Sequence, residues 1–208
     1  MYLVDTNILI DYYLCFYMIS YRKSIEDNVK QAKYCKSLRD LLVSTERLLM
    51  SDLSMREFML KLIDKFVESL TPPPKELGNR DLIGFTDELV KKLVNNLGIS
   101  VVNTNGEVLN EAYEVSRIVN EKISTRSHSK DSRKRELRKL GRDVINMIHA
   151  YKSNASLLTK DPNLVSLLEM LNFASCSISK FKELNTKYCK ILIKINDKIL
   201  QFTLILIT

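Results

Sequence analysis

Two acidic side chains follow short apolar segments at distant places in the chain. Asp5 ends the apolar run 2–4, and Asp161 comes shortly after the apolar run 156–158. If both runs are strands of a parallel sheet, their carboxyl ends lie at the edge where α/β proteins bind ligands. Removing an unpaired carboxylate from water costs several kcal/mol, so we expect each acid to have a partner.

Two further acids lie on segments whose apolar residues repeat with a helical period. Glu57 borders the apolar face of a helix predicted over 51–70, and Asp143 precedes Val144 on a helix face that continues to Tyr151. Four carboxylates in one pocket would repel one another unless a cation lay between them, and oxygen ligands of this kind suit Mg²⁺ or Mn²⁺. The candidate catalytic residues and metal ligands are therefore Asp5, Glu57, Asp143 and Asp161.

Ordinary structural roles for these acids remain open at the level of the sequence. Asp5 could be the N-cap of a helix that begins near Ile8. Asp143 could pair with Lys139 or Arg142 on its own helix, although an exposed pair of this kind contributes only about 0.3–0.5 kcal/mol.

The elements that must position these acids alternate between short strands and helices. This alternation predicts an α/β fold with a central parallel sheet and helices on both faces. A linker is expected over 71–79, because three consecutive prolines cannot continue a helix. Strands are predicted at 2–4, 99–103, 156–158 and 173–179, and helices from Ile8 and over 24–48, 51–70, 87–97, 107–123, 137–151 and 164–171.

The last part of the chain has a different character. The segments KILIKIN and ILQFTLILIT are separated only by Asp197 and Lys198, which predicts two strands joined by a tight turn. A hairpin as apolar as this one would promote aggregation if its edges were exposed. We therefore expect its edge strands to be paired or covered. We therefore expect one domain over 1–180 and a C-terminal extension over 181–208 that forms a β-hairpin.

The positive charge of the chain is concentrated in one segment. The net charge is +7, and the segment 122–142 holds nine Lys or Arg against two acids, so it carries the whole excess. Such a basic segment suits a polyanion such as nucleic acid, and the alternative is a solvated loop and helix face. Residues 124–132 include no apolar side chain, so we expect a flexible arm that becomes helical from Arg133. The residues expected to contact nucleic acid are Arg126, Lys130, Arg133, Lys134, Arg135, Arg138 and Lys139.

Several classes of protein are disfavoured by the composition. No segment reaches the ~18–20 apolar residues of a membrane span, and Asp5 falls where a signal peptide would be apolar, so a cytoplasmic protein is expected. The four cysteines form no C-x-x-C pair, which disfavours zinc. A disulfide is expected only in a host that keeps them inside its cells. By its spacing from Val144 and Met147, His149 is expected at the surface.

The order of these residues resembles that of the PIN-domain nucleases. The resemblance rests on Asp5 in LVDTNILID, on Glu57 followed by Phe58, and on the pattern D-x6-A-x8-T-x-D that begins at Asp143 and ends at Asp161. It implies a PIN-like fold and metal-dependent cleavage of phosphodiester bonds, usually in RNA. Many members are toxins of the VapC type, which pair with a small antitoxin protein and often form homodimers.

The resemblance also implies roles for neighbouring polar residues. Thr6, Asn7 and Thr159 are expected to orient ligands or water around ions that lower the pKa of a water molecule and neutralise charge on the phosphate. A non-catalytic PIN-like protein that binds RNA or serves as a scaffold in a larger complex is the alternative. A receiver-like phosphotransfer domain would need an aspartate in a middle strand, whereas the predicted strand 99–103 ends in Asn103.

Overall fold

The computed structural model describes residues 1–17, 25–69, 79–124 and 130–208. Within these ranges helices and strands alternate along most of the chain, which confirms the expected α/β class. The helices are α1 (Thr6–Tyr17), α2 (Ile25–Val43), α3 (Asp52–Ser69), α4 (Asn79–Asn96), α5 (Gly106–Ser124), α6 (Lys130–Lys152) and α7 (Pro162–Met170). The strands are β1 (Tyr2–Val4), β2 (Leu48–Ser51), β3 (Ile99–Val102), β4 (Ser156–Thr159), β5 (Ala174–Phe181), β6 (Leu184–Ile195) and β7 (Lys198–Ile207).

The described strands form one sheet in the order β3-β2-β1-β4-β7-β6-β5. The pairs from β3 to β7 are parallel, whereas β6 runs antiparallel to both β7 and β5. The prediction of a parallel sheet is therefore wrong for β5 and β6, because a two-residue turn can join only antiparallel strands. The predicted hairpin is present as β6 and β7, and β7 pairs with β4 inside the sheet.

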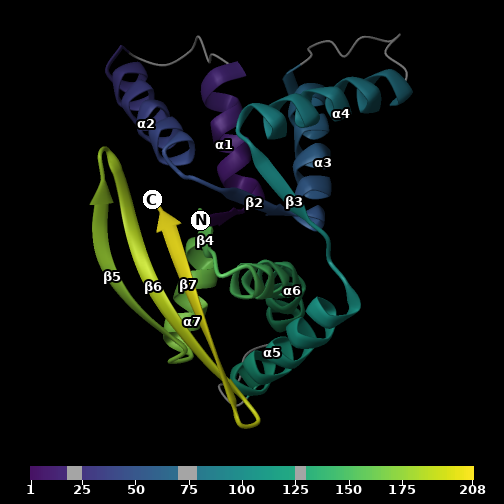
Figure 1. The fold of residues 1–208 in the computed structure, drawn as a ribbon, viewed down its shortest axis with the longest axis vertical. Coiled ribbons are helices and arrows are strands. Elements are labelled where there is room, and N and C mark those ends of the chain that lie inside the picture. The colour runs from purple at the N-terminus through teal and green to yellow at the C-terminus, as the bar shows by residue number, and fades with distance from the viewer. Residues whose placement is uncertain (18–24, 70–78, 125–129) are drawn as a thin grey trace.

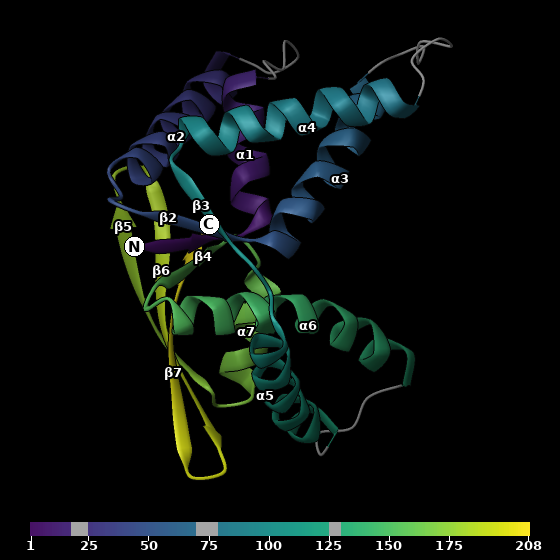
Figure 2. The ribbon, with the colours of Figure 1, turned by 45° about the vertical axis from the view of Figure 1, so that its right-hand side comes forward.

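Helices cover both faces of the sheet, with α1–α4 on one side and α5–α7 on the other (Figures 1 and 2). Consecutive residues of a strand point to opposite faces, and a strand buried on both faces is therefore apolar throughout. Leu157 belongs to the core beneath α5–α7, and Leu158 to the core beneath α1–α4. Leu3 and Val4 of β1 are divided between the two cores in the same way.

One strand was not predicted. The helix expected over 24–48 ends at Val43, and residues 48–51 form β2, which lies fully buried between β1 and β3. A four-residue apolar run next to a helical pattern cannot be identified as a strand from periodicity alone. Ser51 caps the N-terminus of α3, since its hydroxyl accepts a hydrogen bond from the Ser54 N–H at 3.1 Å.

The four cysteines form two disulfides. Cys15–Cys35 joins α1 to α2, and Cys176–Cys189 joins directly opposite residues of β5 and β6. The predicted linker over 71–79 lies outside the described residues apart from Asn79, the first residue of α4. None of the described helices combines the length and the apolar composition needed to cross a bilayer.

Candidate active site

The four predicted acids line one cavity of about 200 Å³ at the carboxyl ends of β1 and β4. Asp5 follows β1 and Asp161 follows β4, as the sequence predicted. Glu57 comes from α3, which begins where β2 ends, and Asp143 comes from α6. The lining consists of Asp5, Asn7, Glu57, Lys61, Arg142, Asp143, Asn146 and Asp161.

Asp5 is buried, with 7% of its surface exposed. Its carboxylate accepts hydrogen bonds from the Thr6 N–H at 2.8 Å and the Thr159 hydroxyl at 2.8 Å, and a longer one from the Asn7 side chain at 3.5 Å. Burial nevertheless raises the pKa of Asp5, with a smaller contribution from Glu57. Thr6, Asn7 and Thr159 therefore contact a carboxylate of the cavity, and the contact with Thr6 also ties Asp5 to the start of α1.

Asp143 is a strongly perturbed acid of the cavity. Its pKa is raised to about 7, first by burial and then by the charges of Asp5 and Asp161, while Arg142 opposes the shift. Because each carboxylate makes its neighbours harder to ionise, the cavity stabilises an added positive charge and disfavours a further negative one.

Glu57 is held by two cations and a hydroxyl. Its Oε1 lies 3.1 Å from the Lys61 ammonium and 2.7 Å from the Arg142 guanidinium, and its Oε2 accepts a hydrogen bond from Thr6 at 3.2 Å. Lys61 also donates to the Asn7 Oδ1 at 2.9 Å. The recorded ion pair of Arg142 is thus with Glu57 on α3, rather than the pair with Asp143 considered from the sequence.

Asp161 is the N-cap of α7. Its side chain accepts a hydrogen bond from the Asn163 N–H at 2.8 Å, and its own N–H donates to the Thr159 hydroxyl at 3.1 Å. Helix capping accounts for an acid at this position without any ligand. Asp161 nevertheless lines the cavity and contributes to the charge that acts on Asp143.

The donor chemistry of the cavity fits a hard divalent cation, since carboxylate oxygens are its preferred ligands. In the described part of the chain, however, no three acidic, histidine or cysteine side chains are arranged so that they could hold a metal ion. Glu57 is engaged by Lys61 and Arg142 instead. Binding a cation through Glu57 would therefore require that carboxylate to leave its ion pairs.

Sequence reasoning did not identify three residues of the cavity: Lys61, Arg142 and Asn146. Lys61 stands four residues after Glu57, so a helical register could have placed it beside that acid. Asn146 stands three residues after Asp143 and accepts hydrogen bonds from Ser51 at 2.7 Å and Ser54 at 3.2 Å. These hydrogen bonds connect α6, which carries Asp143, to the start of α3, which carries Glu57.

The prediction that His149 lies at the surface is wrong, because only 4% of it is exposed. Its Nε2 lies 3.0 Å from the Thr104 hydroxyl, which donates to Asp52 at 2.5 Å. Burial lowers the pKa of His149. The three residues connect α6, the segment after β3 and the first turn of α3 by polar contacts. The apolar residues of α6 gave no basis for predicting these contacts.

The predicted nucleic-acid contacts fall where side chains are not described. Arg126 lies outside the described residues. For the others the structure gives only the backbone of α6, which begins at Lys130 and not at Arg133 as predicted. Their side chains lie outside the description, and RNA binding by them stays a prediction. This group is Lys130, Arg133, Lys134, Arg135, Arg138 and Lys139.

No known protein family matches the chain, and no curated protein matches its sequence.

Proposed function

We propose that this protein is a metal-dependent endoribonuclease with a PIN-like fold, hydrolysing phosphodiester bonds in RNA. The observation that carries the proposal is the cavity in which Asp5, Glu57, Asp143 and Asp161 meet at the strand ends. The raised pKa of Asp143, at about 7, results first from burial and then from the neighbouring carboxylates, and perturbed acids of this kind are enriched at functional sites.

The residues of the cavity would have different roles in such a reaction. Asp5, Asp143 and Glu57 would hold Mg²⁺ or Mn²⁺, and Asp161 is a further candidate ligand. The cation would supply Lewis-acid stabilisation of the charge that develops on the phosphate. The Thr159 hydroxyl and the Thr6 N–H fix the orientation of the Asp5 carboxylate through their 2.8 Å hydrogen bonds.

A specific observation favours a second candidate, a non-catalytic PIN-like protein that binds RNA or serves as a scaffold. Two cations already neutralise Glu57, so the cavity is partly charge-balanced by the protein itself. A protein of this kind would bind RNA through its basic segment and would have no need of a divalent ion. The two candidates therefore differ in whether RNA is cleaved when Mn²⁺ is added.

The test is cleavage of a single-stranded RNA by the purified protein in Mn²⁺ and in EDTA. We expect cleavage only with the metal, and a loss of more than about a hundredfold in Asp143→Asn. Asp87→Asn on the exposed face of α4 removes a similar acid away from the cavity and should retain full activity. Equal cleavage in EDTA, or an active Asp143→Asn, would reject the proposal.

A toxin role with an antitoxin partner, and a homodimer, are narrower proposals that rest on the resemblance alone. A small open reading frame directly upstream would favour the toxin. An RNA substrate agrees with a cytoplasmic location. The two disulfides restrict such a location to a cell that maintains protein disulfides internally, as hyperthermophiles do.

A further inference from the structure

Lys61 and Arg142 are the basic side chains that line the acidic cavity, and both contact the same oxygen of Glu57. They come from different helices, α3 and α6, and so approach Glu57 from two elements. Both are substantially exposed, at 38% and 55% of their side chains, whereas Glu57 is 21% exposed. The two cations are therefore more accessible to solvent than the carboxylate that they contact.

A contact with Glu57 alone does not account for this arrangement. An ion pair between groups exposed to this degree contributes about 0–1 kcal/mol to stability. Two cations outnumber the one carboxylate that they contact, but Asp5, Asp143 and Asp161 line the same cavity, so a phosphate oxygen would be attracted to the two cations once a divalent cation offsets these acids. Arginine and lysine are also the side chains that bind phosphate groups most readily, the former with two parallel hydrogen bonds.

The two cations and a divalent metal ion would compete for the same carboxylate. Glu57 cannot keep both ion pairs and also serve as a metal ligand with the same oxygen. When Glu57 turns to a metal ion, Lys61 and Arg142 lose their acidic partner next to the place where the phosphate would lie.

We propose that Lys61 and Arg142 are the phosphate-binding residues of this cavity, and that Glu57 holds them until it binds a divalent cation. This inference rests on the proposed function. It adds a coupling that the function alone does not require. Binding of the metal ion and binding of the RNA phosphate would depend on each other, because Glu57 would exchange Lys61 and Arg142 for the metal ion.

The coupling predicts effects of opposite sign for one substitution. Replacing Lys61 or Arg142 with Met removes a positive charge beside the metal ligands and leaves Glu57 with one cationic partner instead of two, so Mn²⁺ should bind about tenfold more tightly. The same substitution removes a phosphate contact, so RNA should bind about tenfold more weakly in the presence of Mn²⁺. A merely structural ion pair would not produce this pair of opposite shifts.

The experiment measures Mn²⁺ binding by calorimetry on the intact protein without RNA. RNA binding is measured in Mn²⁺ and in EDTA, with a short single-stranded RNA whose phosphorothioate linkages resist hydrolysis. Lys61→Arg, which keeps the charge, should resemble the wild-type protein. Urea unfolding shows that each variant is folded.

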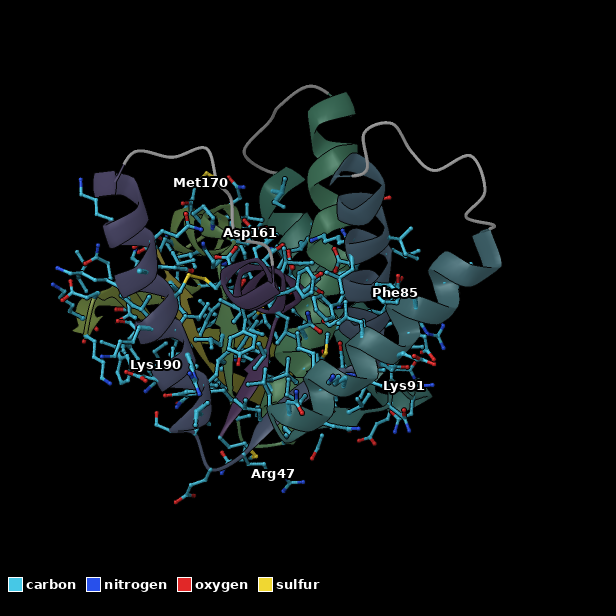
Figure 3. The ribbon with its side chains drawn as sticks, turned by 90° about the horizontal axis from the view of Figure 1, so that it is seen from above. Arg47, Phe85, Lys91, Asp161, Met170 and Lys190 are labelled. Atoms are coloured by element: carbon cyan, nitrogen blue, oxygen red, sulfur yellow. A yellow bond between two sulfur atoms is a disulfide. The ribbon has the colours of Figure 1, made fainter. Side chains whose placement is uncertain are left out.

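Lys91→Met is the matched control. Lys91 forms the same i,i+4 pair with Asp87 on α4, and Figure 3 places Lys91 well away from Asp161. This variant carries the same change of net charge and should leave both affinities unchanged.

The outcomes separate the two proposals. Absence of Mn²⁺ binding by the wild-type protein would overturn the proposed function and this inference with it. Wild-type binding of Mn²⁺ with no tightening in Lys61→Met and Arg142→Met would overturn the inference alone. Tighter Mn²⁺ binding with unchanged RNA affinity would also overturn it, since the cations would then not contact phosphate.

Discussion

The raised pKa of Asp143 makes a quantitative prediction about stability without metal. A carboxyl group whose pKa is higher in the folded than in the unfolded protein stabilises the fold only while it is protonated. Its contribution is complete below the ordinary value of 3.8 and is lost as the pH rises toward about 7. Asp143→Asn removes this penalty, so the variant should become progressively more stable than the wild-type protein between these two pH values.

The magnitude follows from the size of the shift. The interval from 3.8 to about 7, at 1.36 kcal/mol per unit, corresponds to a penalty of about 4 kcal/mol above pH 7. A typical domain is stable by only about 5–15 kcal/mol, so a change of this size is easily measured. The penalty comes first from burial and then from Asp5 and Asp161, and Mn²⁺ should reduce it in the wild-type protein by neutralising the cavity.

The assay is urea unfolding in EDTA at several pH values from 4 to 8, for both proteins. We expect the difference in unfolding free energy to increase by up to about 1.4 kcal/mol per pH unit and to level off above pH 7. The control Asp87→Asn, on the exposed face of α4, should change stability by less than about 1 kcal/mol at any pH. A difference for Asp143→Asn that does not vary with pH would refute the reasoning.

Three further predictions concern other parts of the molecule. Calorimetric titration with Mn²⁺ should show binding to the wild-type protein and none to Asp5→Asn, and equal affinity in both would contradict the metal site. Replacing Arg133, Lys134 and Arg135 with Ser should weaken binding of unrelated RNA sequences alike and flatten the salt dependence by about two units, at ~0.7 per lost contact, while cleavage at saturating RNA changes little. A Cys15→Ser, Cys35→Ser double variant should lose about 2–4 kcal/mol of stability in urea, because the disulfide closes a loop with a sequence separation of 20, and an unchanged midpoint would show that the bond does not form.

Local patterns were sufficient for most of the fold. The stripe of apolar residues on α6 and the short apolar run of β4 each favour one conformation, so both elements could be predicted directly. Strand β2 could not, because its four residues become a strand only by pairing with β1 and β3 on either side. The direction of β6 likewise follows from the turn before β7, while the pairing of β7 with β4 depends on the whole sheet.

The candidate site shows the same limit. Asp5 and Asp161 could be predicted to meet because both follow strands, and the structure places them in one cavity. Arg142 on α6 contacts Glu57 on α3, and no residue pattern within either helix predicts a contact between the two helices. Buried His149 contacts Thr104, which donates to Asp52, and both residues come from segments distant in the sequence.

The position of β1 in the sheet affects when the cavity can form during synthesis. The Thr159 hydroxyl that binds Asp5 is separated from it by 154 residues, and β4 gains its second neighbour only with β7. At about 5–20 residues per second, a ribosome needs roughly eight to thirty seconds to add Thr159 after Asp5 has been made. A nascent chain that has not reached β4 lacks Asp161, and a shorter one that ends before α6 lacks Asp143 as well. If the protein cleaves RNA, the growing chain would thus remain harmless to the messenger and the ribosome that produce it.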